Sequence, residues 1–501
     1  MNRNEPQKSV PRDDGEAGMT KRGATWFVIL VLSFYLFTAV WIVFFRAMII
    51  SRVPTAESGA MNLRHLKWFW IGSGAMWVVL TALFIAARKY DVKFSKTRFA
   101  RTALLILISA IVIRGVVVGM HQPGLSDDIW RYVLDGEVSA SGHNPYVVAP
   151  KEVKHDNERY EGEYALAIRV NHPELVTIYL PVSEVIFALS AKMNDWWSGS
   201  EGRTRVDPDR AAFVFRLVMI AFEIGTMVLL ALVLFSMKRS AWYLAMYAWH
   251  PLAISEFAGE GHQDAIGICL MVCALAIWHF RPKSVVRFSG LVALAGLVKP
   301  ITIPIVAIAL HHGRRSFGKW VWSAIVGVIV CSAFLVPYLV YPNSLGGERL
   351  LGTIDVFLYK WAFFGSVYEP LLSFTGDELW SRRICSGLLL IVWLVLLVRR
   401  SEPWRGSLVF LFVAALVSTT VWPWYLLWAL VLFPIRPSAS LWIATLTIPW
   451  GYVVLGDVVR WTVSPWVMWL TYVPIYAVLI VEIWWLFLKQ RKVGGRDRSN
   501  E

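Results

Sequence analysis

Cysteine and sites for covalent modification are scarce in this sequence. The 501 residues include four cysteines, all within or at the end of apolar segments, where a thiol packs as a small hydrophobe. A disulfide framework is therefore not predicted. No Asn-x-Ser/Thr acceptor for glycosylation occurs, which fits a bacterial membrane. The first 23 residues lack the apolar core and small-residue cleavage site of a secretory signal, so the first apolar span is expected to be an uncleaved anchor.

The spacing that metal ligands require is also missing. Cys269 and Cys273 share a helix face, but no His or carboxylate is spaced to complete a metal set. Four histidines are scattered through one long loop without ligand spacing: His121, His143, His155 and His172. No metal site and no other cofactor is therefore predicted, and a divalent metal near the acidic residues of that loop stays an open alternative.

Long polar stretches are rare as well. Hydrophobic residues make up 57% of the chain, which includes 27 tryptophans, and this share exceeds that of soluble domains. Apolar runs of roughly 17 to 25 residues, the length that a helix needs to cross a bilayer, recur from Trp26 to Leu488. We therefore expect an all-α polytopic membrane protein.

The formal net charge of +14 comes from short basic clusters between the apolar spans. Membrane topology explains this pattern, so nucleic acid is not an expected partner. The clusters expected to be cytoplasmic lie at 8–22, 88–101, 238–239, 281–287, 314–319, 399–405, 436 and 489–492. Residues 1–23, expected to be disordered, and residues 489–501 are then cytoplasmic tails of a membrane body that covers residues 24–488. One expected outer turn, from Arg46 to Lys67, is also basic.

This placement sets the order of the spans. After spans near 26–45, 68–87 and 102–120, an outer loop covers residues 121–212, within which residues 176–194 form a helix on the membrane face. Residues 288–311 lie between two basic clusters, so they are expected to form a hairpin of two half-length helices with Lys299 at its tip. Later spans are expected near 318–340, 384–398, 406–421, 424–435, 440–456 and 466–488. The bundle then has roughly 12 to 14 helices.

Acidic, basic and aromatic residues crowd the start of the outer loop. Asp127 and Asp128 follow directly after the third span, and the same stretch contains Arg131, Tyr132, Asp135, Asn144 and Tyr146. An Asp-Asp pair alone is common at helix caps and in solvated loops. The density of polar side chains around the pair favours chemistry at the membrane surface, and these five further residues are expected to bind substrate.

A second polar group is expected on the same side. Residues 256–264 include Glu256, Glu260, His262 and Asp264, and they form either a solvated turn or a site in which Glu260, His262 and Asp264 are expected to bind substrate. Charges within or near apolar spans need partners. Lys299 is predicted to bind a ligand phosphate or to pair with a buried acid, and Arg216 either binds the same phosphate or extends its charge to the membrane surface.

The aromatic residues of the later outer turns have an ordinary explanation. Trp422-Pro423-Trp424-Tyr425 is expected to belong to an interfacial aromatic belt. Asp457, Arg460 and Trp461 are expected to anchor the chain at the surface, and no chemistry is assigned to them.

Sugar transfer from a lipid-linked donor fits this set of residues. An acceptor hydroxyl is a weak nucleophile, and a carboxylate that removes its proton accelerates attack by roughly 10² to 10⁴. The departing lipid phosphate gains negative charge, which Arg131, Arg216 or Lys299 could stabilise. Adjacent carboxylates can divide the work, one taking the proton and its neighbour orienting the acceptor.

The wider sequence context resembles one family. Ser126-Asp127-Asp128-Ile129-Trp130-Arg131-Tyr132, Asp135-Gly136 and Gly142-His143-Asn144-Pro145-Tyr146 are similar to the first outer loop of bacterial polyprenyl-phosphate-sugar-dependent mannosyltransferases, which belong to the GT-C superfamily. His250-Pro251-Leu252, Gly261-His262-Gln263-Asp264 and Lys299-Pro300 resemble later signatures of the same family. Leu180-Pro181 replaces a paired proline, and two extra spans precede the loop.

This resemblance implies a GT-C-like bundle with a catalytic outer loop. It implies that Asp127 is the catalytic base, that Asp128 assists it, and that a polyprenyl-phosphate sugar, with mannose expected, is the donor. The acceptor would be a glycan or glycolipid, and inverting displacement of a β-linked donor would give an α-linked product. The alternatives are a transporter or flippase of lipid-linked saccharides, which typically has internal repeats that are not evident here, and a non-catalytic scaffold.

Overall fold

The computed structural model describes residues 21–50, 63–89, 94–155, 164–199, 206–340, 353, 355–356, 359–456 and 461–497. The chain begins with α1 (Lys21–Ile50), α2 (Leu63–Lys89) and α3 (Lys96–Met120). A group of shorter helices follows: α4 (Asp128–Ala140), α5 (Pro150–His155), α6 (Tyr164–Ala167) and α7 (Pro181–Ser198). The described part of the chain is helical and contains no strand beyond two isolated bridges between 363–364 and Thr420.

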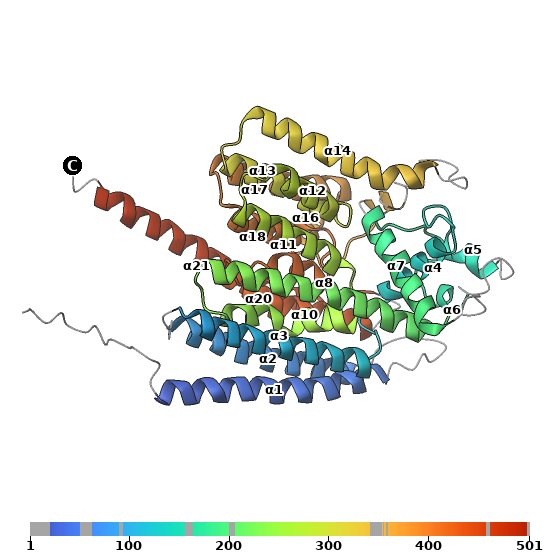
Figure 1. Cartoon of the computed structure of the whole chain (residues 1–501), viewed down its shortest axis with the longest axis horizontal. Coiled ribbons are helices and arrows are strands. Elements are labelled where there is room, and N and C mark those ends of the chain that lie inside the picture. Colours follow the sequence, from blue (N-terminus) through green and yellow to red (C-terminus); the bar gives the residue numbers. More distant parts are fainter. Residues whose placement is uncertain are drawn as a thin grey trace, which may run out of the picture.

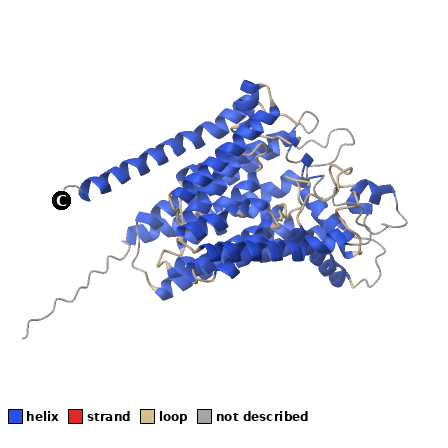
Figure 2. Cartoon of the chain, turned by 90° about the horizontal axis from the view of Figure 1, so that it is seen from above, coloured by secondary structure: helices blue, strands red, loops and turns tan. Residues whose placement is uncertain are grey.

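The central elements are α8 (Pro208–Ser236), α9 (Trp242–Ala248), α10 (Pro251–Ala253), the π-helical turn η1 (Ile254–Gly259), α11 (Asp264–Phe280), α12 (Val285–Gly296), the short 3₁₀ turn η2 (Pro300–Thr302) and α13 (Pro304–His312). The last are α14 (Phe317–Val340), α16 (Tyr368–Thr375), α17 (Glu378–Val398), α18 (Pro403–Val417), η3 (Pro423–Leu426), α19 (Leu427–Leu430), α20 (Ala439–Thr447), η4 (Ile448–Gly456) and α21 (Pro465–Asp497). The long helices run roughly side by side in a bundle (Figures 1 and 2).

Length and composition confirm the predicted all-α polytopic membrane protein. Among the described residues, eight helical segments are long and apolar enough to cross a membrane. Four shorter apolar helices are α11, α12, the segment Pro300–His312 and α18. Large apolar side chains on α14, α17 and α21 are exposed, as expected for helices that face lipid.

The first and last helices extend into the two regions predicted to be tails. Residues 1–20 lie outside the described part of the chain, and α1 already begins at Lys21. At the other end α21 continues from the last predicted span to Asp497, while residues 498–501 lie outside the described part.

Helix α7 corresponds to the predicted helix at 176–194. It packs against α4 and α8, at the end of the bundle where α4 to α6 also gather (Figure 1). The contact between α4 and α7 is close because Gly136 has no side chain: a Cβ at Gly136 would lie 2.5 Å from the backbone oxygen of Phe187. The two helices therefore form a compact unit that fixes the start of α4. The position of α7 on the membrane face stays a prediction.

The predicted hairpin with Lys299 at its tip is confirmed. Helix α12 ends at Gly296, the chain turns at Lys299 to Thr302, and α13 returns. Arg315, just after α13, donates to the carbonyl oxygen of Pro282, just before α12, and stacks over Trp278. Both ends of the hairpin therefore lie at the same end of the bundle.

The prediction of a regular helix at 424–435 is wrong. This segment consists of η3, the four-residue helix α19 and a series of turns between Pro423 and Pro434. Its side chains are largely buried among the other helices, and irregular backbone at membrane depth is tolerated when protein surrounds it. Pro434 has no backbone N–H and its ring clashes with the carbonyl group four residues earlier, which agrees with the end of α19 at Leu430.

One ion pair within the spans was not predicted. Arg114 of α3 and Glu223 of α8 are fully buried, and the guanidinium donates from Nε to Glu223 Oε2 at 2.6 Å and from Nη2 to Oε1. Arg114 Nη1 also donates to the carbonyl oxygen of Ala248 at 2.8 Å. Paired charges of this kind join α3, α8 and α9.

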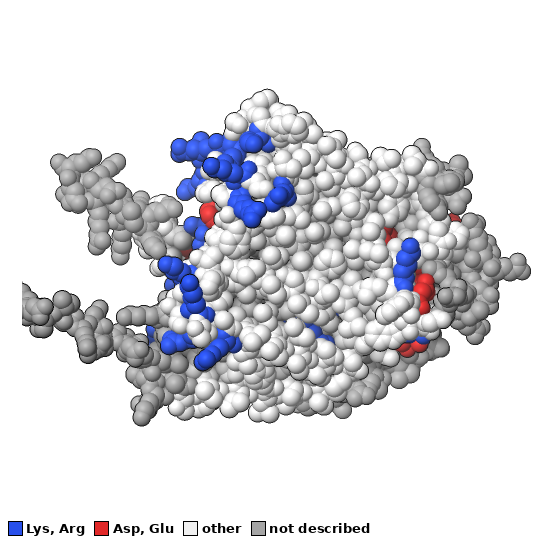
Figure 3. Space-filling model, viewed as in Figure 1, with Lys and Arg blue, Asp and Glu red and all other residues white. Residues whose placement is uncertain are grey.

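Basic side chains gather at one end of the bundle. Figure 3 shows Lys and Arg concentrated at the end from which the C-terminal helix projects. The connections between helices also contain many of the basic residues, namely Lys238, Arg239, Arg281, Lys283, Arg314, Arg315, Arg399, Arg400 and Arg436. The unit of α4 to α7 lies at the opposite end (Figure 1).

Candidate active site

The aspartate pair stands at the beginning of α4. Asp127 occupies the N-cap position, and its carbonyl oxygen accepts from the amide of Trp130 at 3.1 Å. Asp128 is the first helical residue, and its amide donates to Ser126 Oγ at 3.2 Å. Both aspartates are half-buried. Anionic groups are favoured at a helix N-terminus, where the backbone N–H groups point toward them.

Glu260 fixes the loop that precedes α4. Its Oε2 accepts from the amides of Gly124 at 2.8 Å, Leu125 at 2.8 Å and Ser126 at 3.2 Å. Its Oε1 lies 3.1 Å from Nε2 of His121. Burial opposes ionisation, but the bonds from His121 and Gly124 outweigh it and lower the pKa of Glu260. Glu260 therefore acts on the aspartates through the loop.

Arg216 supports the same junction. It is buried, and its Nη1 donates to the carbonyl oxygens of His121 at 2.7 Å and Gly259 at 3.4 Å. Gly261 beside it has φ of +72°, and a Cβ there would lie 2.9 Å from Arg216 Cγ, so only glycine fits. Arg216 thus joins α8 to both loops instead of extending to the membrane surface, and phosphate binding by it stays a prediction.

Asp128 is linked to the second polar group through Tyr132. The Tyr132 hydroxyl donates to Asp128 Oδ2 at 3.3 Å and lies 3.3 Å from Nδ1 of His262. Burial raises the pKa of Asp128; His262 and the bond from Tyr132 lower it, while the neighbouring charges of Asp127 and Asp264 raise it further. The two sequence stretches that resembled family signatures therefore meet in space.

Residues 256–264 are not a solvated turn. Glu256, Glu260, His262 and Asp264 are all at most 2% exposed. His262 Nε2 lies 3.3 Å from Glu256 Oε2, and Tyr452 of η4 donates its hydroxyl to both oxygens of Glu256, at 2.9 and 3.0 Å. A π-helical turn carries Glu256, and such turns frequently occur at functional sites.

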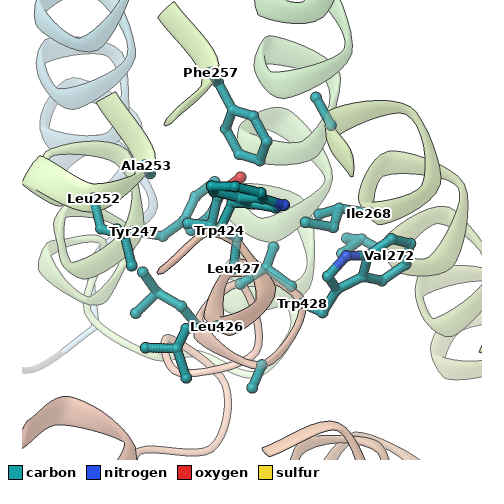
Figure 4. Packing of buried hydrophobic residues seen from close by; sticks show 14 of the residues in the cluster. Tyr247, Leu252, Ala253, Phe257, Ile268, Val272, Trp424, Leu426, Leu427 and Trp428 are labelled. Carbon is teal, nitrogen blue, oxygen red and sulfur yellow. The ribbon is translucent and has the colours of Figure 1, made fainter. Parts of the chain in front are cut away.

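The aromatic-belt interpretation of Trp424 and Tyr425 is wrong. Trp424 is 6% exposed and stacks on the ring of His262, with centroids 3.9 Å apart. Figure 4 shows Trp424 among buried apolar side chains, including Phe257 and Leu427. Tyr425 lies under the Lys299 ammonium, 3.9 Å from Nζ to the ring centroid. Both rings therefore line the polar cluster from the C-terminal half of the chain.

Lys299 pairs with a buried acid. Its Nζ donates to Asp264 Oδ1 at 2.9 Å, and the same oxygen accepts from Trp428 Nε1 at 2.5 Å. The Lys299 side chain is 27% exposed, whereas that of Asp264 is 2% exposed. The ammonium is therefore anchored while part of the Lys299 side chain stays exposed, so the two predicted roles of Lys299 are compatible.

Arg131 and Asp135 form a separate group deeper in the α4–α7 unit. Arg131 Nε donates to both oxygens of Asp135 at 2.9 Å. Glu184 of α7, which the sequence analysis did not assign to the site, accepts from Thr177 Oγ1 at 2.8 Å. Burial, reinforced by Asp135, raises the pKa of Glu184 well above its usual range. Thr177 also bonds to Asp135, so this group links α4 to the segment before α7.

Asn144 and Tyr146 hold the loop that follows α4. Asn144 Oδ1 accepts from the amide of Tyr146 at 3.0 Å, and its Nδ2 donates to the carbonyl oxygen of Tyr338 at 3.1 Å. The Tyr146 hydroxyl donates to the carbonyl oxygen of Tyr179 at 2.7 Å. These contacts attach the loop to α14 and to the segment before α7.

Within the described residues, no group of three or more His, Cys, Asp or Glu side chains is arranged to hold a metal ion. The four cysteines are unpaired. What the site offers is a half-buried carboxylate pair, a buried His–Glu pair behind it and the anchored ammonium of a partly exposed lysine. Such a set can accept a proton and stabilise a developing anion.

Comparison with known proteins agrees with this chemistry. A family model described as alpha-(1->6)-mannopyranosyltransferase, N-terminal domain, matches residues 37–312, more than half of the chain. A search of curated proteins found no match. The matched range includes Asp127, Asp128, Glu260, His262 and Lys299. The predicted resemblance is thereby confirmed, and this multi-pass chain belongs to the alpha-(1->6)-mannopyranosyltransferase family.

Proposed function

We propose that this protein transfers mannose from a polyprenyl-phosphate donor to a glycan or glycolipid acceptor by inverting displacement at the outer face of the membrane. One observation carries the proposal: within the range matched by the family model, the aspartate pair at the start of α4 stands beside the buried His262 and Asp264. The family description further suggests an alpha-(1->6) linkage in the product.

The proposed reaction uses two parts of the site. The acceptor hydroxyl oxygen attacks the anomeric carbon of mannose, the bond from that carbon to the phosphate oxygen breaks, and polyprenyl phosphate leaves. Asp127 takes the hydroxyl proton, while Asp128 orients the acceptor. Lys299 stabilises the leaving phosphate, because its side chain is partly exposed and its ammonium is held in place by Asp264. A β-linked donor then gives an α-linked product.

The charge distribution supports an outer-face site. Basic residues are enriched in cytoplasmic loops of membrane proteins. Lys and Arg gather at the end of the bundle opposite to α4 and α7 (Figures 1 and 3). With that end in the cytoplasm of a bacterial inner membrane, both termini are cytoplasmic and the aspartate pair faces outward, where donor and acceptor would meet.

A reconstituted assay tests this function. The purified full-length protein in proteoliposomes receives labelled polyprenyl-phosphate mannose or GDP-mannose, together with an α-mannoside acceptor. We expect label transfer from the lipid donor alone, into a product that an α-mannosidase releases. Transfer from GDP-mannose without the lipid would contradict the donor assignment. Movement of the lipid-linked sugar across the bilayer without glycosyl transfer would support the transporter alternative.

A further inference from the structure

A continuous row of polar groups runs from Asp128 into the protein. It passes from Asp128 Oδ2 to the Tyr132 hydroxyl, from there to His262 Nδ1, and from His262 Nε2 to Glu256, with 3.3 Å at each step. Tyr452 closes the row by donating to Glu256. Tyr132, His262 and Glu256 are at most 1% exposed, so only the Asp128 end is open to a substrate.

His262 is placed to act through Tyr132 and not by direct contact with a sugar. One face of its ring is covered by Trp424, and its two nitrogens lie next to Tyr132 and Glu256. The ring is 0% exposed. This geometry favours a positioning role for His262. Direct substrate binding, which was expected from the sequence, does not fit a ring that is enclosed in this way.

The charges around this row explain why Asp128 needs such support. Asp127 precedes it, and Asp264 contributes a further negative charge. Burial and two neighbouring carboxylates all favour the neutral form of Asp128. The opposing groups are the cationic form of His262 and the Tyr132 hydroxyl.

The titratable groups next to His262 are Asp128 and Tyr132 of α4, Glu256 of η1 and Asp264 of α11. Beyond them lie Tyr452 of η4, which interacts with Glu256 and Asp128, and Tyr425 of η3, which interacts with Asp264 and Asp128, together with Glu260 and Lys299. Burial lowers the pKa of His262, but Glu256 first, then Asp128 and Asp264, outweigh it and raise the pKa above its usual value. A cationic His262 is therefore compatible with its buried position.

We propose that His262, paired with Glu256 at 3.3 Å and acting through the Tyr132 hydroxyl, keeps Asp128 ionised beside Asp127. The catalytic meaning of this arrangement rests on the proposed transferase function. In the ionised state, Asp128 can orient the acceptor hydroxyl, and its negative charge makes Asp127 a stronger base. Glu256 and Tyr132 thereby become positioning residues of the site.

The pH dependence of transfer tests this role. Removing the His262 cation raises the pKa of Asp128, so less of Asp128 is ionised at neutral pH. We expect H262Q to move the acidic limb of the rate profile to higher pH by at least about one unit, a roughly tenfold loss on that limb that higher pH restores. E256Q and Y132F should move it in the same direction by less.

Matched variants separate this effect from damage to the fold. H172Q changes an exposed histidine that also lies beside a glutamate, Glu174 at 3.6 Å, and should leave the profile unchanged. Y132F keeps the ring that packs against Phe215, so it supplies the same test where H262Q does not fold. A uniform fall in rate, with the acidic limb unmoved in H262Q and Y132F, would overturn the proposal.

A second readout does not depend on activity. Infrared spectroscopy of the solubilised protein, titrated with acid, reports the protonated carboxyl of Asp128 as the band that D128N removes. We expect this band to appear at higher pH in H262Q than in the unmodified protein. The same midpoint in both would refute the role of His262. A shifted midpoint in a protein without transferase activity would refute the proposed function while the inference on Asp128 stands.

Discussion

Replacing Glu260 by glutamine should weaken both the fold and the reaction. The Glu260 carboxylate accepts three backbone amides of residues 124–126, at 2.8, 2.8 and 3.2 Å, in a buried position. Bonds to a charged acceptor contribute about 1.5 to 3 kcal/mol each and bonds to a neutral one about 0.5 to 1.5 kcal/mol. A loss of about 1 kcal/mol for each bond gives about 3 kcal/mol of unfolding free energy for E260Q.

The catalytic effect follows from the same geometry. Residues 124–126 lead directly into Asp127, so a looser loop displaces the aspartate pair. A misplacement of about 1 Å can cost roughly 10² in rate, and we expect E260Q to lower kcat of mannosyl transfer by roughly 10- to 100-fold. Because the pKa of Glu260 is lowered in the folded protein, its stabilisation is complete above the ordinary carboxyl pKa and is lost as the pH falls through the folded value.

Two measurements check this prediction. Denaturant unfolding in detergent gives the stability, and the reconstituted assay gives kcat. E174Q is the matched control, because Glu174 is an exposed glutamate of the same predicted loop, and it should change neither quantity. An E260Q protein with unaltered stability and unaltered kcat would refute the idea that Glu260 holds the loop.

Two further predictions concern the other buried charges. R114M should destabilise the protein by about 3 to 5 kcal/mol, because it leaves Glu223 buried and unpaired. The double variant R114M/E223M should recover most of that loss in unfolding free energy. If unfolding in detergent shows the double variant to be equally unstable, the result would argue against the pair. K299M should lower kcat/KM for the lipid donor by roughly 10² or more, because it removes the cation next to the leaving phosphate. Unchanged donor kinetics in K299M would exclude that role.

The apolar helices and the hairpin were predictable because their signals are local. The apolar runs predicted the helices. Because the basic clusters before and after residues 285–312 were both expected on the cytoplasmic side, they predicted the hairpin that the structure contains. The 424–435 segment has the same apolar composition as a span, but composition does not show that its only regular helix, α19, ends at Leu430.

The candidate site was only partly predictable, because its contacts connect distant parts of the chain. Asp127, Asp128 and Lys299 could be selected from the sequence because charge is unusual beside apolar spans. The partner of Glu256 is Tyr452, 196 residues away, and Arg114 is separated from Glu223 by 109 residues. Trp424 follows a pattern that is common at membrane interfaces, so its stacking on His262 has no local signal.

The most direct test of the central claim compares D127N with the unmodified protein in the transfer assay. D209N is the control, because Asp209 is exposed and makes a surface ion pair with Arg169. With equal amounts of folded protein, we expect D127N to lose roughly 10² to 10⁴ of the rate of transfer from polyprenyl-phosphate mannose. Full activity of D127N, or an equal loss in D209N, would contradict the assignment of Asp127 as the base.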